Sequence, residues 1–550
     1  MFVMEVATWM NKIKENRFIN YMNGKMNMKV FYVLIIGIFV LAMFISVFFG
    51  ALDTDMSFLI ASGNEIFENG IPYKNVWCMD HNASIVLQQW LYCVIIATFH
   101  KLGVMGLFLL SIITFSIFVL LVKAFFKVKG ISNNRIYFLY LCMMAAYSAY
   151  LFKVRPQTVT LIIMLLECYG LEKYKATSKS RWLILVPLSM LLEINLHASM
   201  WPMHFAMLLC YVVPPVFKGI EDTSIVKMGK KPLIISLICM IAVMFANPYG
   251  IDGIMYIVRS MSSGSLDALS IAELATPTYF SPTTVTLLVL VAGCIILWKI
   301  KKLDSVTLYM CLGISFLSIL KLRNNMFNSI PLLYVCLKLA NAYESQDKFV
   351  IDWQKDIKRY LYPFFALTYV MLFFMIVSLF NNIVGTDKTY AVLKTGDKVE
   401  IVQHFNKFNY DKDFALIEEY IEKNDCYHDK IFTGFNTGAY MEYLGCDNVF
   451  IDARPEIYDR HLNGSNDFIQ EYTSIVIPSS YSAGLCDLSK SSENYKDFLK
   501  KFTEKYDFDY VVIDARLEEV VYGMYLDSRV DYEMVEDVST ATYYFYRKIK

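Results

Sequence analysis

The chain contains 550 residues, of which 56% are hydrophobic and 19% charged, and its mean hydropathy is +0.42. Apolar runs of about 20 residues recur between Val30 and Phe380, which argues against a wholly water-soluble protein and predicts that most of the chain lies in a membrane. The formal net charge is zero, and no nucleic-acid partner is expected.

The neutral total hides an uneven distribution of charge along the chain. Residues 385–550 contain 31 acidic and 19 basic side chains, whereas the first 384 residues contain 20 acidic and 32 basic ones. An acidic segment that follows a basic, apolar region is typical of a water-exposed domain. We therefore expect a cytoplasmic segment over 1–29, a membrane domain over 30–384 and an external soluble domain over 385–550.

The positions of Lys and Arg predict the orientation of the spans, because cytoplasmic loops are enriched in these residues. The first span, near 30–50, runs outward from the basic N-terminal segment. The segment 84–99 is short and contains Gln88 and Gln89, so we expect an interfacial helix within a first external loop over 51–103. Ten further spans are predicted near 104–126, 135–152, 157–172, 182–196, 198–217, 232–246, 283–300, 304–320, 326–342 and 360–380, which gives about eleven in all.

The external segment has the pattern of a small α/β domain. Helical periodicity is present at 411–424 and 492–505. Residues with high β propensity cluster at 430–433, 448–452, 510–514 and 542–546. Because the strands alternate with helices, we expect a partly parallel sheet.

The sequence gives little reason to expect a cofactor. Cys426, Cys446 and Cys486 allow one disulfide in the external domain, but their spacing assigns no pairing. Asp53 and Asp55 are close enough to hold a divalent metal together, yet no ligand spacing supports one. We predict no metal and no cofactor.

Polar residues gather at the ends of the spans that this topology places outside. They are Asp53, Asp55, Gln89, Arg155, Gln157, His197, Arg323 and Asn324, with Glu273 in the loop 247–282. The segments Asn195-Leu196-His197 and Asn247-Pro248-Tyr249-Gly250 lie on the same side. A transporter places its polar groups near the bilayer centre, so the pattern favours a site at the external membrane surface.

These residue types suit the transfer of a sugar from a lipid phosphate. A carboxylate can take the proton from an acceptor hydroxyl as the oxygen attacks the sugar. Arg155 and Arg323 can bind the departing phosphate, since guanidinium groups match phosphate oxygens, and His197 can donate a further hydrogen bond. No Gly-rich nucleotide loop is evident, so a nucleotide-sugar donor is not favoured.

Several motifs together resemble those of a group of bacterial integral-membrane glycosyltransferases of the GT-C class, a superfamily that includes mannosyl- and aminoarabinose-transferases. The motifs are D-x-D-M-S-F-L-I-A-S-G from Asp53, the Gln-Gln-Trp-Leu helix, R-P-Q, N-L-H, N-P-Y-G and R-N-N. In the external domain, G-A-Y-M-E-Y-L from Gly438 and V-F-I-D-A-R-P-E-I-Y from Val449 resemble the same group. The resemblance implies an inverting transfer from a polyprenyl-phosphate sugar with Asp55 as the base.

The chain departs from that group at two places. Relatives often have aromatic residues and a His after the Asp, where this chain has Ser57, Phe58 and Leu59. They often have His-Glu before the Trp, where this chain has Gln88 and Gln89. These departures indicate an altered substrate or a member that is no longer catalytic.

The sequence thus predicts a polytopic α-helical membrane protein of GT-C architecture with an external α/β domain. Asp55 is the expected base, and Asp53 supports it or orients the acceptor. The expected donor is a polyprenyl-phosphate sugar in contact with membrane lipid, and the expected acceptor is a saccharide, a lipid or a protein. The expected location is the cell membrane, with the C-terminal domain outside. Two alternatives remain: a transporter or flippase of lipid-linked saccharide, and a non-catalytic scaffold whose external domain binds a partner.

Overall fold

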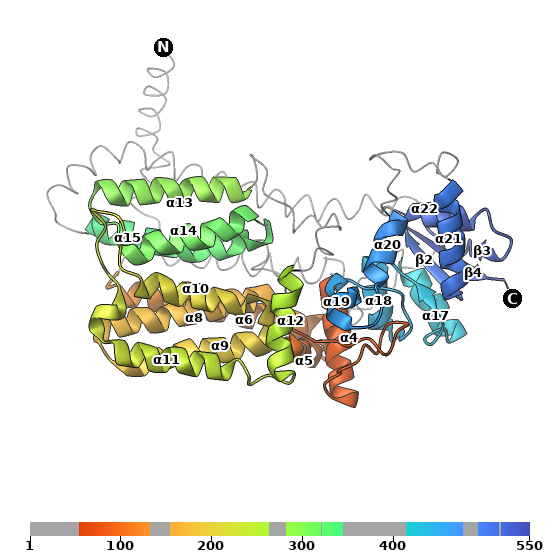
Figure 1. The fold of residues 1–550 in the computed structure, drawn as a ribbon, viewed down its shortest axis with the longest axis horizontal. Helices are drawn as coiled ribbons and strands as arrows, with labels where there is room; N and C mark the ends of the chain where they lie inside the picture. The colour runs from red at the N-terminus through yellow and green to blue at the C-terminus, as the bar shows by residue number, and fades with distance from the viewer. Residues whose placement is uncertain are drawn as a thin grey trace, which may run out of the picture.

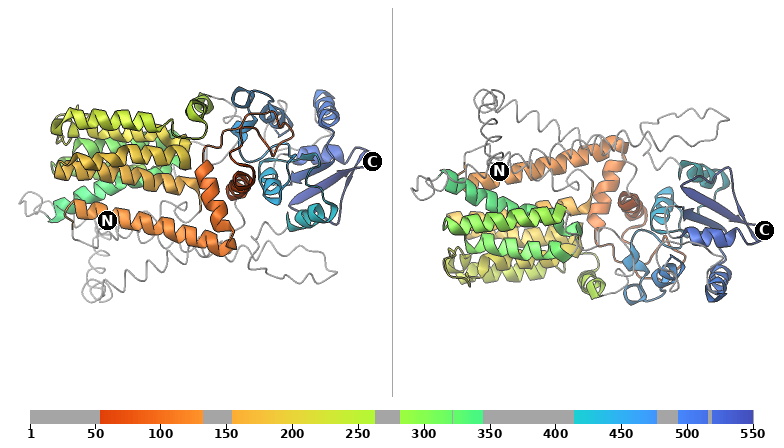
Figure 2. Two further views of the ribbon diagram at one scale, coloured as in Figure 1. Left: turned by 90° about the horizontal axis from the view of Figure 1, so that it is seen from below. Right: turned by 90° about the horizontal axis from the view of Figure 1, so that it is seen from above.

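The structure, a computed structural model, describes residues 54–131, 154–262, 282–320, 322–344, 414–476, 493–515 and 519–549. A bundle of long helices lies at one end and a mixed sheet with its own helices at the other (Figure 1). Helices α4 (Thr54–Asn69) and α5 (Trp90–His100) lie between these two regions, as the two further views also show (Figure 2).

The bundle is built from the apolar segments of the first 344 residues. Its helices are α6 (Gly103–Val128), α8 (Pro156–Thr177), α9 (Leu185–Leu196), α10 (Trp201–Val212), α11 (Lys230–Val243), α13 (Pro282–Lys299), α14 (Ser305–Leu320) and α15 (Ser329–Glu344). Helix α12 (Gly250–Ser262) stands across their ends (Figure 1). Short 3-10 turns occur at η2 (Ser180–Ile184), η3 (Ala198–Met200), η4 (Ile225–Met228) and η7 (Leu322–Asn328).

The predicted GT-C architecture with about eleven transmembrane helices is wrong. Among the described residues, α6 is the one helix that is long and apolar enough to cross a membrane. A spanning helix needs about 20 apolar residues, whereas α9, α10 and α11 have 12, 12 and 14 residues. Helix α8 has 22 residues but carries Glu167, Glu172, Lys173 and Lys175. The predicted spans near 30–50, 135–152 and 360–380 lie outside the described residues.

The C-terminal region contains one four-stranded mixed sheet in the order β1-β2-β4-β3. Strand β1 (Ile431–Phe432) pairs in parallel with β2 (Tyr510–Asp514), and β4 (Tyr543–Lys548) pairs antiparallel with both β2 and β3 (Tyr532–Met534). The helical elements around the sheet are α17 (Ala415–Asn424), α18 (Phe435–Leu444), η9 (Pro455–Tyr458), α19 (Arg460–Asn463), α20 (Phe468–Val476), α21 (Glu493–Tyr506) and α22 (Val520–Leu526).

The segment predicted as a strand over 448–452 joins the two regions instead of extending as a regular strand. Val449 forms single parallel bridges with Ile431 on one side and with Cys78 on the other. The Val449 amide donates to the Trp77 carbonyl at 2.9 Å. The loop between α4 and α5 is therefore attached to the α/β domain. Cys446, which precedes this segment, is a free and buried thiol, as is Cys426; Cys486 lies outside the described residues.

Close packing of α4 against both neighbours fixes the junction. Leu59 and Ile60 of α4 are fully buried, in the same apolar cluster as Ala439 of α18. Gly63 lets α5 approach, because a Cβ at this position would stand 2.2 Å from the carbonyl oxygen of Cys93. Much of the motif that begins at Asp53 thus encodes helix packing, and Asp55 is carried at the start of a firmly held helix.

Candidate functional site

Asp55 and Arg155 form an ion pair where α4 and α8 begin. Asp55 lies in the first turn of α4, where a carboxylate interacts favourably with the helix dipole. Arg155 is the N-cap of α8 in extended backbone, followed by Pro156, a residue well suited to the first helical position. Nη1 of Arg155 lies 3.0 Å from Oδ2 of Asp55, and the two side chains are 7% and 30% exposed, respectively. The pair therefore offers a partly exposed carboxylate held by a buried guanidinium.

Gln157 follows one residue after Pro156 and is partly buried. Its side-chain oxygen Oε1 is buried and has no hydrogen-bond partner among the described residues. Buried polar atoms are nearly always paired with protein or with water. The start of α8 therefore has one buried side-chain acceptor without a protein partner among the described residues, two positions after Arg155.

His197 ends α9, and both of its ring nitrogens contact protein hydroxyl groups. Nδ1 lies 2.7 Å from the hydroxyl oxygen of Thr160, and Nε2 lies 3.0 Å from that of Ser199. The Thr160 hydroxyl in turn donates to Oε1 of Glu193 at 2.8 Å. The structure thus turns His197 toward the interior of the bundle instead of toward Asp55.

The segment before α5 contacts the end of α9. The predicted helix over 84–99 begins only at Trp90, with Gln89 as its N-cap. The Gln88 carbonyl accepts from the Ala198 amide at 2.9 Å, and the Trp90 indole donates to the Asn195 side chain at 2.9 Å. The backbone of the predicted interfacial segment is therefore fixed against the N-L-H motif.

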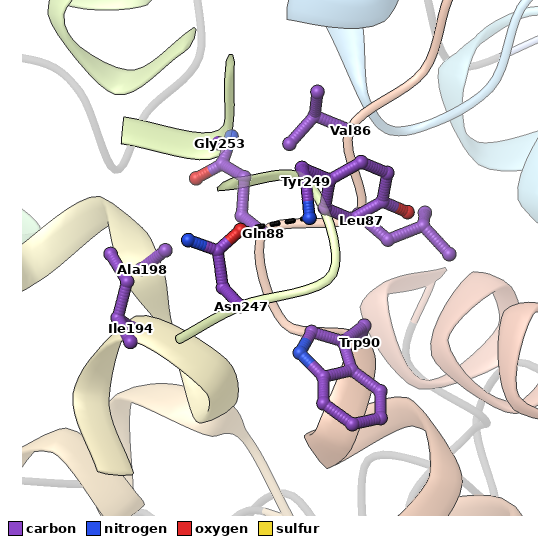
Figure 3. Close-up of a pocket in the computed structure, with 9 residues that line it drawn as sticks. All are labelled: Val86, Leu87, Gln88, Trp90, Ile194, Ala198, Asn247, Tyr249 and Gly253. Carbon is purple, nitrogen blue, oxygen red and sulfur yellow. Dashed lines mark hydrogen bonds between the residues drawn. The ribbon is translucent and has the colours of Figure 1, made fainter. Parts of the chain in front are cut away.

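A small hollow lies at this contact. It encloses about 220 Å³ of space, open solvent included. Its lining residues are Val86, Leu87, Gln88, Trp90, Ile194, Ala198, Asn247, Tyr249 and Gly253 (Figure 3). Pockets that bury a small ligand usually measure about 300–1,000 Å³, so this hollow is too small to bury a sugar-phosphate.

The N-P-Y-G motif is a turn that ties α12 to the first loop. The Asn247 side chain accepts from the Tyr249 amide at 2.9 Å, as the dashed line in Figure 3 marks. The Tyr249 hydroxyl donates to the Pro72 carbonyl at 3.0 Å, and the Tyr73 hydroxyl donates to the Pro248 carbonyl at 3.2 Å. These contacts make the motif structural.

Asn324 also makes structural contacts. Its amide nitrogen donates to the Leu317 carbonyl at 3.0 Å, and its own carbonyl accepts from the Ser318 hydroxyl at 3.1 Å. It therefore folds η7 back onto the end of α14, and no described contact links it to Asp55. Asp53 and Glu273, together with the side chain of Arg323, lie outside what the structure describes, so their roles stay predictions.

A second buried ionic group links the α/β domain to α4. Arg454 donates to Oε1 and Oε2 of Glu442 at 2.6 and 2.7 Å, and its Nε lies 3.1 Å from both carboxylate oxygens of Asp452. Its guanidinium carbon lies 5.2 Å from the ring centre of Phe58 and 4.7 Å from that of Trp77. Because Arg454 is 5% exposed and contacts both regions, this group holds the domain on α4.

The pKa values of the two carboxyl groups beside Arg454 are shifted in opposite directions. Burial raises the pKa of Glu442 above its usual value despite the attraction of Arg454. For Asp452, burial acts the same way, but the charge of Arg454 and hydrogen bonds, one of them from Tyr458, outweigh it and lower the pKa to about 2. Burial thus disfavours the ionised form of Glu442, whereas Arg454 and its hydrogen bonds favour the ionised form of Asp452.

Sequence reasoning missed a buried acid–base cluster inside the bundle. His204 of α10 lies with Nδ1 2.5 Å from Oε2 of Glu167 and with Nε2 3.4 Å from Oε2 of Glu193, and all three side chains are fully buried. Glu167 and Glu193 could have indicated this cluster, because each is an acidic residue in an otherwise apolar segment. His204 lies in a short run of hydrophobic residues, and no sequence motif marks it as their partner. Within the described ranges, no group of three His, Cys, Asp or Glu residues is arranged to hold a metal ion.

The contacts therefore bring Asp55 to Arg155, whereas His197 and Asn324 contact other residues; Gln157 lies two positions after Arg155 in the chain. Comparison with the models of known families finds no match, and comparison with curated proteins finds none either.

Proposed function

We propose that the protein transfers a sugar from a polyprenyl-phosphate donor to an acceptor hydroxyl, with Asp55 as the base. The observation that carries the proposal is the ion pair of Asp55 and Arg155, 3.0 Å apart, with the carboxylate partly exposed and the guanidinium buried. A base and a phosphate-binding cation side by side are the two groups that the reaction needs.

The reaction is a single inverting displacement. The acceptor oxygen bonds to the anomeric carbon as the bond from that carbon to the phosphate oxygen breaks, and the electron pair leaves with the phosphate. Asp55 takes the proton of the acceptor hydroxyl. Arg155 stabilises the negative charge on the departing phosphate, because a guanidinium presents five N–H donors in a fixed fork.

Four predicted residues assist in this proposal. Asp53 precedes Asp55 by two residues and orients the acceptor, and Gln157 accepts a hydrogen bond from a substrate hydroxyl through its unpartnered Oε1. Arg323 provides a second cation for the phosphate, and Glu273 a further polar contact. His197 has no part in it, because its ring nitrogens contact Thr160 and Ser199.

The outer face of the bundle supports a lipid-linked donor and a place at the cell membrane. Several of its helices expose large apolar side chains, among them Ile234, Ile238 and Phe245 around α11 and Leu312 and Phe316 on α14. Large exposed apolar side chains on bundle helices are expected where a protein contacts a membrane or another protein. The proposal needs only that this face contacts lipid, and it does not require that every helix crosses the bilayer.

The test is transfer of radiolabelled sugar from a panel of polyprenyl-phosphate donors by the purified, folded protein. Asp55→Asn should abolish transfer while donor binding persists, and Arg155→Lys should weaken donor binding, because the bidentate fork is lost. Asp252→Asn is the matched control: Asp252 also begins a helix and faces an arginine, Arg259, at 3.8 Å, but it is 77% exposed. Transfer that survives Asp55→Asn at the level of Asp252→Asn would refute Asp55 as the base.

A transporter of lipid-linked saccharide is less well supported. It requires a continuous polar path wide enough for a sugar, and the buried polar groups from Thr160 to Glu167 contact one another directly. Side chains packed in this way leave room for a proton and not for a saccharide. If the protein transferred sugar from none of the donors in the panel, the transfer assay would favour the scaffold alternative.

A further inference from the structure

Six polar side chains form a connected series from the edge of the bundle into its core. Three of them, called the polar chain here, are Ser199, His197 and Thr160; the other three, called the buried cluster, are Glu193, His204 and Glu167. Ser199 is partly exposed, whereas every member of the buried cluster is fully buried. Helices α8, α9 and α10 and the turn η3 supply the six residues.

The hydrogen bonds of the polar chain have one consistent direction. The Thr160 hydroxyl has a single proton and donates it to Glu193 at 2.8 Å, so Nδ1 of His197, 2.7 Å away, is the donor to Thr160. Nε2 of the neutral ring then accepts from Ser199 at 3.0 Å. Each group in the chain therefore donates inward and accepts from outside.

The buried cluster has one carboxyl group too many for its single imidazole. A protonated His204 balances one carboxylate of the pair Glu167 and Glu193, and the second would remain as a buried negative charge. Such a charge is costly unless it is paired or neutralised by a proton. Oε1 of Glu167 has no hydrogen-bond partner among the described residues. Nδ1 of His197 lies 3.9 Å from Oε1 of Glu193, but in the neutral form that the polar chain assigns to this ring it offsets no charge.

Other charged groups on the neighbouring elements do not compensate the buried cluster. Helices α9 and α10 carry no further charged side chain. On α8 and the elements packed against it, Glu172 pairs with Lys129 and Asp304 with Lys338, and Lys175 faces both of these carboxylates. These five side chains leave one positive charge at the far end of α8, and Lys173 at the same end faces the rings of Tyr169 and Trp182. None of the six forms a hydrogen bond or ion pair with the buried cluster.

We propose that the buried cluster is a proton-binding site, and that it exchanges its proton with the surface through the polar chain. The ligand is a proton held between two carboxyl groups and an imidazole. The site is distinct from the proposed sugar-transfer site, and its existence does not depend on that activity.

Proton entry follows the hydrogen bonds and needs no oxidant or reductant. A proton that reaches Nε2 of His197 allows the Nδ1 proton to pass to Thr160, whose hydroxyl proton moves to Oε1 of Glu193. The proton received at Oε1 neutralises the second carboxylate of the buried cluster, and His204 stays the imidazolium that faces both carboxyl groups.

The bound proton is detected by infrared difference spectroscopy of the full chain between acid and alkaline buffer. The wild type should give a C=O band of a buried, protonated carboxyl group, and Glu193→Gln and Glu167→Gln should each abolish it. Either substitution leaves one carboxylate to balance one imidazolium, so the extra proton is no longer required. Glu442 gives a separate band that both variants retain, which verifies that the protein is folded. A cluster band unchanged in both variants would overturn the proposal.

The route is tested by a substitution that keeps the charges of the cluster. Thr160→Val has nearly the same shape but lacks the hydroxyl, so the band should keep its amplitude while its appearance after a pH jump slows by at least about tenfold. Ser189→Ala is the matched control, since Ser189 is a fully buried hydroxyl on α9 without a hydrogen-bond partner among the described residues. An exchange rate in Thr160→Val equal to that of Ser189→Ala would exclude the polar chain as the route.

Discussion

Replacement of Arg454 by methionine should lower the free energy of unfolding of the α/β domain by about 3–5 kcal/mol, because it leaves a buried carboxylate without its partner. Methionine keeps much of the side-chain volume, so the loss is mainly that of charge and hydrogen bonds. Arg454 also lies 5.2 Å from the ring centre of Phe58 and 4.7 Å from that of Trp77. Contacts of a cation with an aromatic ring contribute about 0.5–2 kcal/mol each. The total is a large part of the roughly 5–15 kcal/mol that stabilises a typical domain.

The assay is hydrogen exchange of the β2 and β4 amides, which reports the free energy of opening of the sheet. The control is Arg547→Met: Arg547 pairs with Glu533 across β3 and β4, but the two side chains are 50% and 44% exposed. An exposed pair of this kind contributes about 0–1 kcal/mol. If Arg454→Met changed the opening free energy no more than Arg547→Met, the assignment of Arg454 as the group that holds the domain on α4 would be refuted.

Three further substitutions follow from the same contacts. Burial raises the pKa of Glu442 in the folded protein, so its contribution to stability falls as pH rises above the unfolded value of 4.5; Glu442→Gln should flatten that decline in unfolding curves measured from about pH 5 to 9. Asp452 has the opposite effect, because folding lowers its pKa from 3.8 to about 2. Its contribution to stability, about 2 kcal/mol, should therefore be lost as the pH falls from 3.8 to about 2. In Asp452→Asn this pH-dependent loss should be absent. Gly63→Ala should destabilise the protein by about 1–3 kcal/mol through overpacking against Cys93, whereas Gly313→Ala on α14, with open space around it, should be neutral or stabilising in thermal unfolding.

Most of the described helices were predicted from the sequence, but their assignment as transmembrane helices was wrong. The apolar runs at 157–172 and 304–320 match α8 and α14 closely, because hydrophobic residues mark the buried faces of helices wherever these lie. Whether such a helix crosses a bilayer depends on its length and on its charges. Of the four charged residues in the second half of α8, Glu167 and Glu172 are buried and paired with His204 and Lys129, whereas Lys173 and Lys175 are partly exposed. Those partners come from α6 and α10, which no local pattern reveals.

The same limit applies to the strands. The run at 510–514 is predicted at its observed bounds, since a short apolar run rich in β-branched residues is a local feature, and four of its five residues are buried in succession. The run at 448–452 has the same composition, but its neighbours are a single residue of β1 and a loop more than 350 positions earlier in the chain, so only Val449 forms bridges. Strand β3 was missed because Glu533 and Met534 are exposed and give no apolar pattern.

Within the candidate site, sequence reasoning was most useful where the partner was itself a predicted polar residue. Asp55 and Arg155 were assigned to one side of the molecule from the distribution of lysines, and the structure brings them into contact. His197 was assigned to the same side but faces Thr160, a residue that looks like ordinary helix surface in the sequence. Hydroxyl partners of this kind cannot be distinguished from packing residues without the fold.

Helix α8 carries both of the polar systems described here and separates them. Arg155 precedes its first turn and Glu167 lies 12 positions later, which corresponds to about 18 Å along the helix axis at 1.5 Å per residue. Direct transfer of a proton between Asp55 and Glu167 is therefore excluded by distance. Thr160 is the polar-chain residue that lies on α8, about 8 Å along the helix axis from Arg155. If the two systems were coupled, Thr160→Val would change the pH dependence of sugar transfer as well as the infrared exchange rate; if they are independent, as the inward direction of the hydrogen bonds indicates, it will change only the second.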